Sequence, residues 1–232
     1  MPDHRKFNRR PRSERIAEIC RAARAAFAEN GYEGAVIADI AAAAGIAEGT
    51  IYKLFDSKRD LLHAVIADWY GSFVANLDRQ LASLNDPAQK LRFLIWHHLT
   101  VINADPALCR VFFREIRAYD GYRGSSMYEL NRTYTAFTVQ VIEEGVASGA
   151  FRADVPVAMV RDAVFGGLEH YTWRFLAGRE PLDVERTTQL FWQFVVRGIA
   201  ADPTPDTNPE SRLEAVVERL ESVAERIGTG RD

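Results

Sequence analysis

The stretch GYEGAVIADIAAAAGIAEGTIYKLFDSKRDLLHAVI, residues 31–66, decides the fold. It holds two short runs of apolar residues at helical spacing, the first ending at Gly45 and the second reaching only from Ile51 to Phe55. Two helices this short, joined by the tight turn Gly45-Ile46-Ala47, have the proportions of a helix-turn-helix. Neither helix carries enough apolar surface to fold alone, so the flanking helices must supply the core.

Those flanking helices are visible on both sides of the stretch. Upstream, apolar residues repeat at three and four positions, which predicts a helix with Ser13 as its N-cap and Asn30-Gly31 as its end. The repeating residues are Ile16, Ile19, Cys20, Ala23 and Phe27. Downstream, Ser57 and Asp60 have the spacing of a capping box and open a long helix that runs through Phe73.

The helix predicted at about 47–55 points Ile51 and Phe55 inward and leaves a small, polar outer face. Its candidate DNA-contacting residues are Glu48, Gly49, Thr50, Tyr52 and Lys53. A short exposed helix of this kind can enter a DNA major groove. Glu48 either accepts from a cytosine amine or is simply solvated, and the Tyr52 ring either reaches DNA or packs helix 47–55.

Residues 1–12 form a basic arm in front of this domain. Within residues 1–15, six Arg or Lys residues stand against two carboxylates, although the whole chain has a net charge of −3. We expect Arg9, Arg10 and Arg12 to contact phosphates. On charge alone, a solvated terminus explains the arm equally well.

The remaining segments also read as helices, so the predicted fold class is all-α with about nine helices. Turn residues and Asp-Pro pairs divide them, which places the later helices at about 87–103, 106–119, 127–148, 156–177 and 183–201. Residues 202–212 are a Pro-rich linker. Leu213, Leu220 and Ile227 recur at seven residues and predict a short amphipathic tail helix.

Composition excludes several other classes. The chain of 232 residues is 47% hydrophobic and 26% charged, which is globular, and its apolar runs are too short to span a membrane. Cys20 and Cys109 read as buried, reduced thiols of a cytoplasmic protein without a secretory signal. The sequence contains none of the catalytic or cofactor-binding motifs that we searched for, so neither an enzyme nor a cofactor is expected. The neighbouring His97 and His98 point about 100° apart on a helix, so a metal site is not expected either. A small helical-bundle enzyme or a protein-binding adaptor remains the alternative.

The quoted stretch resembles the DNA-binding domain of tetracycline-repressor-like (TetR family) transcriptional regulators. The matching elements are Asp39-Ile40-Ala41, Ala44-Gly45-Ile46, Gly49-Thr50-Ile51-Tyr52, Phe55, Ser57-Lys58 and Leu61-Leu62. The resemblance implies a DNA-binding domain at 13–60, a ligand-binding and dimerisation domain at 61–201, and no membrane partner. It implies that Thr50 and Tyr52 contact DNA, that Lys53 lies over the groove and that Lys58 contacts a phosphate.

This chain departs from the family pattern at several polar positions. The family often has Ser or Thr opening the first short helix and the recognition helix, where this chain has Ala35-Val36-Ile37 and Ala47. Ala38 stands where Arg is frequent, and Leu54 where His or an aromatic residue is frequent. The departures remove hydrogen-bond donors, so DNA affinity is expected to depend more on the basic arm.

Within the second domain, the resemblance implies a ligand pocket. Aromatic residues are numerous there, and the candidate lining residues are Trp69, Phe73, Trp96, His97, Phe113 and Phe137. His98 and Arg114 are further candidate polar contacts. The alternative is that these aromatic stripes are ordinary core.

The last two long helices are the predicted dimer interface. Ala163, Gly166 and Gly167 allow close helix approach, and Leu190 and Phe194 add apolar area. The two glycines fit packing within one chain as well. The resulting prediction is a homodimeric regulator, a repressor released from a palindromic operator in double-stranded DNA by an apolar small molecule, with an acyl chain as the candidate effector.

Overall fold

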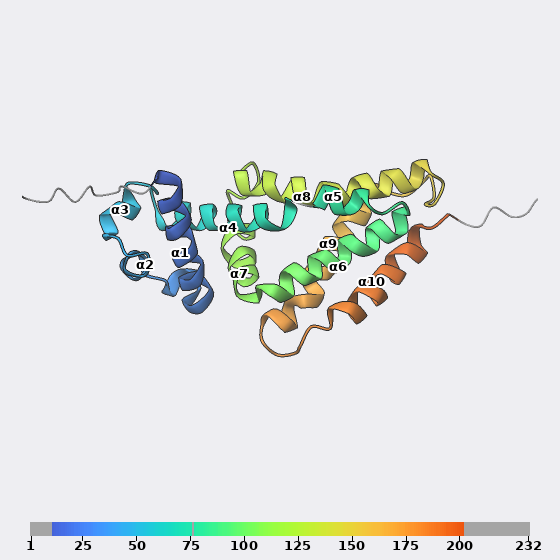
Figure 1. Cartoon of the computed structure of the whole chain (residues 1–232). Coiled ribbons are helices and arrows are strands. Elements are labelled where there is room, and N and C mark those ends of the chain that lie inside the picture. The colour runs from blue at the N-terminus through green and yellow to red at the C-terminus, as the bar shows by residue number, and fades with distance from the viewer. Residues whose placement is uncertain (1–10, 76, 202–232) are drawn as a thin grey trace, which may run out of the picture.

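The computed structural model describes residues 11–75 and 77–201. Their regular structure is helical, and a single antiparallel bridge joins Phe151 to Ala200. Figure 1 shows the helices from α1 to α3 gathered at one end, with α4 running from them into a larger helical body. The all-α fold class predicted from the sequence is confirmed.

The end of the molecule that holds the predicted helix-turn-helix, which we call the head, contains three helices and the first half of a fourth. They are α1 (Arg12–Gly34), α2 (Ile37–Ala43), α3 (Glu48–Tyr52) and α4 (Lys58–Val74). The body consists of α5 (Leu77–Ala82), α6 (Pro87–Ala104), α7 (Pro106–Val111), the π-helical segment η1 (Phe112–Arg117), α8 (Ser126–Ala147), α9 (Val157–Leu176) and α10 (Val184–Ile199).

The core of the head is built from the apolar residues that define its short helices. Phe27 of α1, Ile40 of α2, Ile51 of α3 and Leu61 of α4 are all fully buried. Because α2 and α3 bury so few residues, they depend on α1 and α4 for stability. In the body, α6 packs against α8 and α10, while α7 packs against α1 of the head.

Three of the predicted helix starts are confirmed by their caps. Asp86 and Asp105 each accept a backbone N–H, from Ala88 at 3.0 Å and from Leu108 at 2.9 Å. Ser57 accepts from the backbone N–H of Asp60 at 3.0 Å. The reciprocal bond of the capping box is shifted, because the Asp60 carboxylate accepts from the N–H of Asp56 rather than that of Ser57.

Other helix boundaries differ from the sequence prediction. Helix α1 begins at Arg12 after Pro11, so Ser13 lies inside the helix and its side chain caps nothing. The end predicted at Asn30-Gly31 is a kink inside α1: Gly31 has a positive φ of 70°, which glycine adopts without strain, and the helix continues beyond it to Gly34. The short α5 was not predicted, and the single helix expected at 106–119 changes from α to π at Phe112.

Some sequence predictions concern parts that the structure does not describe. Arg9 and Arg10 of the arm, the linker from residue 202 and the tail helix lie outside the described residues. Both cysteines are buried and free, as predicted, and burial raises the pKa of the Cys20 thiol to about 11. None of the described helices combines the length and apolar character that crossing a membrane requires.

Candidate functional site

The recognition helix α3 presents the outer face that the sequence predicts. Glu48, Gly49, Tyr52 and Lys53 are exposed, and Thr50 is half-buried. Ile51 anchors the helix from the opposite side with only 1% of its surface exposed. With 52% of Tyr52 exposed, its ring is free to reach a ligand outside the domain, which favours the DNA-contact reading over the packing one.

The basic residues near this face differ in their surroundings. Arg12 is exposed at the start of α1. The ammonium of Lys58 lies 3.2 Å from the carbonyl oxygen of Glu33 and 4.6 Å from the centre of the Tyr32 ring. Lys58 therefore ties the start of α4 to the end of α1, and a phosphate contact would compete with that tie.

The departures from the family pattern have a local consequence. Val36 precedes α2 and Ala47 precedes α3, and neither helix has a side-chain cap at its N-terminus. Ala38 and Ala47 are exposed and present only methyl groups. These positions therefore add no polar side chain to the outer face of the head.

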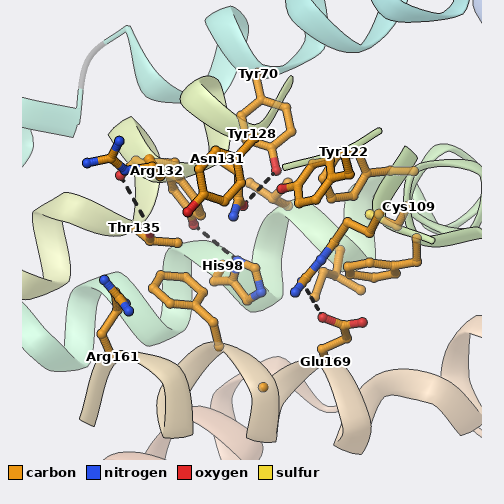
Figure 2. Close-up of a pocket in the computed structure, with 18 of the residues that line it drawn as sticks. Tyr70, His98, Cys109, Tyr122, Tyr128, Asn131, Arg132, Thr135, Arg161 and Glu169 are labelled. Atoms are coloured by element: carbon orange, nitrogen blue, oxygen red, sulfur yellow. Dashed lines mark hydrogen bonds and ion pairs between the residues drawn. The ribbon is translucent and has the colours of Figure 1, made fainter. Parts of the chain in front are cut away.

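A cavity of about 510 Å³ lies in the body and receives side chains from α4, α6, α7, η1, α8 and α9 (Figure 2). Of the residues predicted to line a pocket, Trp69, Phe73 and Phe113 do so, together with His98. Tyr70 and Phe112 complete an aromatic wall, with ring centres 5.5 Å apart. An apolar wall of this kind suits the hydrocarbon part of a ligand.

The other predicted pocket residues lie elsewhere. Trp96 lines a separate cavity of about 270 Å³ and donates to Glu185 at 2.7 Å. His97 and Phe137 are not among the residues lining the larger cavity; His97 packs beside the Phe73 ring, and Phe137 is buried in the core. Arg114 is exposed and is likewise not among the lining residues, because the π-helical turn directs Phe113 and Arg117 to the cavity instead.

Polar groups are concentrated on the other walls of the cavity. Tyr70 donates a hydrogen bond to Asn131 at 3.2 Å, and His98 Nδ1 lies 3.2 Å from the Tyr134 hydroxyl. Burial, reinforced by His97 and Arg117, lowers the pKa of His98 to about 3. His98 is therefore a neutral hydrogen-bonding group in the cavity near neutral pH.

Charged residues surround these groups, and positive charge exceeds negative. The charged lining residues are Arg117, Arg123, Arg132, Arg161, Asp162 and Glu169. Arg117 pairs with Glu169, and Arg161 pairs with Asp162 at 2.8 Å. Burial raises the pKa of Glu169, and the guanidinium of Arg117 opposes that rise. Within residues 11–75 and 77–201, Arg123 forms no ion pair.

Sequence reasoning missed this polar side of the cavity, although a signal was present. On α8 the lining residues Tyr128, Asn131, Arg132 and Thr135 recur at three and four positions. On α9 the same spacing joins Arg161 or Asp162 to Phe165, Gly166 and Glu169. A polar stripe inside an apolar bundle is a pocket signal that a search for aromatic residues overlooks.

The face predicted for dimerisation is partly open. Leu190 and Phe194 of α10 are 56% and 76% exposed, and Ala163 of α9 is exposed too. The glycines have other neighbours. A Cβ atom on Gly167 would lie 2.8 Å from the Phe191 ring, so this glycine allows α9 and α10 of one chain to approach, and Gly166 lines the cavity.

The exposed recognition helix and the separate cavity of the body define a DNA-binding protein with a ligand-binding body. Comparisons with known proteins agree. Residues 19–65 match the family model of the bacterial regulatory proteins of the tetR family, and residues 84–199 match that of the tetracyclin repressor-like C-terminal domain. The chain therefore belongs to the TetR family, and it is a helix-turn-helix transcriptional regulator.

Several relatives align over most of the chain. It is 25% identical to the fatty acid metabolism regulator protein of Bacillus subtilis, over 78% of this chain and 94% of that protein. It is 27% identical to the transcriptional repressor KstR2 of Mycolicibacterium smegmatis, over 81% of this chain and 91% of that one. The crystal structure of FadR from B. subtilis in complex with stearoyl-CoA superposes with a TM-score of 0.72 at 26% identity, covering 79% of this chain and 98% of that chain.

Proposed function

We propose that this chain is a homodimeric repressor that binds a palindromic operator and releases it when an acyl-CoA thioester occupies the cavity. The observation that carries the proposal is a cavity with an aromatic wall and arginines on its polar side, connected to the recognition head by α4. A related regulator was solved with stearoyl-CoA bound, which supports this class of effector.

The two sides of the cavity suit the two parts of a thioester. Trp69, Phe73 and Phe112 offer apolar surface to an acyl chain. Arginines bind phosphate through planar arrays of N–H donors, and the CoA part of a thioester carries phosphates. Arg123 is the best placed of them for a new anion, since it has no ion pair to break in the described part of the chain.

Helix α4 connects the cavity mechanically to the head. Its second half carries the lining residues Trp69, Tyr70 and Phe73, and its first half buries Leu61 and Leu62 in the core of the head. A ligand that displaces the second half therefore moves the head. In a dimer, the two recognition helices must lie about 34–36 Å apart to enter successive major grooves, so a small tilt is enough to disfavour the operator.

Thermodynamic linkage fixes what such a mechanism requires. An effector shifts the dimer between its two states only through its different affinity for them. DNA and effector must then weaken each other's binding by the same factor. We also propose that the protein acts in the cytoplasm. There it binds the thioester without converting it chemically.

The test uses the full-length protein and an operator duplex selected with it from random DNA. Stearoyl-CoA, stearate and CoA are titrated separately, and DNA release is followed by fluorescence anisotropy. We expect stearoyl-CoA to release the DNA at lower concentration than either fragment, because it alone engages both walls. Recovery of intact stearoyl-CoA by chromatography afterwards would agree with binding without turnover.

Two outcomes contradict the proposal. If none of the three compounds changes the affinity for the operator, the cavity does not regulate DNA binding through this class of effector. If stearoyl-CoA is hydrolysed at a rate proportional to protein concentration, the enzyme alternative is the better reading.

A further inference from the structure

The segment 112–122, which comprises η1 and the turn after it, has two faces with different neighbours. We call it the coupling segment. One face contributes Phe112, Phe113, Arg117 and Tyr122 to the cavity lining. The segment includes a π-helical turn, a wide and uncommon geometry that is frequent at functional sites.

The other face of the coupling segment contacts the DNA-binding head. Arg59, the second residue of α4, donates from Nη1 to the carbonyl oxygen of Glu115 at 3.1 Å. Its guanidinium also lies 4.6 Å from the centre of the Tyr119 ring and 5.5 Å from that of Tyr32 in the head. The coupling segment therefore contacts the start of α4, far along that helix from the cavity residues Trp69 and Phe73.

Tyr119 and Tyr122 belong to the same tight turn. The backbone N–H of Tyr122 donates to the carbonyl of Tyr119 at 2.9 Å. Gly121 lies against the Tyr119 ring so closely that a Cβ atom there would be 2.5 Å from it. The turn therefore gives a route from Tyr122 to Tyr119 that does not run along α4.

The hydroxyl of Tyr122 is the group that a ligand would contact. Among the residues that the structure describes, it is one of the few buried side-chain polar atoms without a hydrogen-bond partner. Figure 2 shows the Tyr122 ring extending toward Tyr70 and Asn131 in the cavity. Because buried polar groups are nearly always hydrogen-bonded, this hydroxyl of a cavity-lining residue is a donor that remains available to a bound ligand.

We propose that the coupling segment senses the effector through the Tyr122 hydroxyl and transmits its binding to the head through Tyr119, the Glu115 carbonyl and Arg59. The ligand atom opposite Tyr122 is a hydrogen-bond acceptor, such as the carbonyl oxygen of a thioester. This inference rests on the proposed function and names the residues that carry its regulation.

The chain offers matched controls for both parts of the proposal. Tyr171 of α9 is 57% exposed and is not among the residues lining the cavity, so Tyr171→Phe removes a tyrosine hydroxyl outside the ligand site. Arg24 joins the head to the body through an ion pair with Asp105 at 2.8 Å. Neither Arg24 nor Asp105 lines the cavity, so Arg24→Gln removes a head–body contact that lies outside the coupling segment.

The experiment measures the dissociation constant of stearoyl-CoA for the full-length protein with and without saturating operator duplex. The ratio of the two constants is the coupling factor, which is typically about 5 to 150 in regulated proteins. Tyr119→Leu and Arg59→Gln should leave the affinity of the DNA-free protein for stearoyl-CoA within about twofold and lower the coupling factor at least about fivefold. Tyr122→Phe should weaken stearoyl-CoA binding about threefold to tenfold, as expected for one lost hydrogen bond.

The control variants should keep both the affinity and the coupling factor of the wild type, and circular dichroism melting confirms that each variant is folded. A wild-type coupling factor of one contradicts the proposed function itself. A wild-type factor above one that persists in Tyr119→Leu and Arg59→Gln overturns only the transmission route. Unchanged stearoyl-CoA binding by Tyr122→Phe, or an equal loss of coupling in Arg24→Gln, also overturns the inference.

Discussion

At the residue scale, His98 shows how burial sets the chemistry of the cavity. It lies beside the Tyr134 hydroxyl in a cavity that Arg117, Arg161 and Glu169 also line. Its pKa is lowered to about 3, first by desolvation and then by His97 and Arg117. Neutral His98 can accept or donate one hydrogen bond without bringing a buried charge into the cavity.

This lowered pKa predicts a pH dependence of stability. Below pH 6.5, the ordinary pKa of histidine, His98 is protonated in the unfolded chain but stays neutral in the folded chain. The unfolded state then binds more protons, so the free energy of unfolding falls as the pH drops below 6.5. His98→Gln should remove up to about 1.4 kcal/mol per pH unit from that slope. Urea denaturation at pH 7, 6 and 5 measures it.

His97, whose pKa burial also lowers, should retain its own smaller contribution in the variant. Equal slopes for the wild type and His98→Gln between pH 6 and 5 would show that His98 is charged in the folded protein. In that case the cavity is more hydrated than its packing indicates.

At the element scale, the short helix α3 has a buried side chain that holds it in place and exposed side chains that face outward. Ile51 is buried, whereas Tyr52 and Lys53 next to it are exposed. A helix this short has no stability of its own, so its position is held by the packing of Ile51 and of Phe55 after it. Substitutions on the outer face should therefore leave the head folded.

Lys53→Ala should weaken binding to selected and random DNA by a similar factor. If Lys53 contacts a phosphate, its loss also reduces the slope of log affinity against log salt by about one. Anisotropy titrations at four salt concentrations measure both quantities, and the melting temperature should stay that of the wild type. A wild-type salt slope for Lys53→Ala would exclude a phosphate contact at this position.

At the scale of the whole molecule, α9 and α10 leave an apolar face that no other part of residues 11–75 and 77–201 covers. Leu190, Phe194 and Met159 are all more than half exposed, which is unusual for large apolar side chains in a monomer. The proposed dimer buries part of this face and sets the distance between the two recognition helices. Stability of the dimer and affinity for a two-part operator are thereby linked.

Phe194→Glu should therefore produce monomers, which light scattering detects, and should lower operator affinity at least tenfold because only one half-site can then be held. Gln140→Glu adds the same charge to an exposed position of α8 and is the control. A dimeric Phe194→Glu protein with unchanged operator affinity would move the interface away from this face.

Most of the fold could be predicted because its signals are local. Apolar residues at three and four positions, Asp-Pro and Ser caps, and Gly31 with its positive φ define helices through neighbouring residues only. The helix-turn-helix within residues 31–66 could also be predicted, because the lengths of its two helices and turn are characteristic. The order of the helices other than α5 and η1, and the outward face of α3, were therefore determined by the sequence alone.

The tertiary structure alone decided which side chains meet. Trp69 and Trp96 were both expected to line the ligand pocket, yet Trp69 lines the large cavity and Trp96 turns to Glu185. The change to a π-helix at Phe112 redirected Phe113 and Arg117 and placed Arg114 outside the cavity lining. These outcomes depend on how distant helices pack, and helical spacing specifies a face of one helix without specifying what that face contacts. For the same reason, the sequence did not predict that Arg59 contacts Glu115 and Tyr119, because this contact depends on how α4 packs against the segment 112–122.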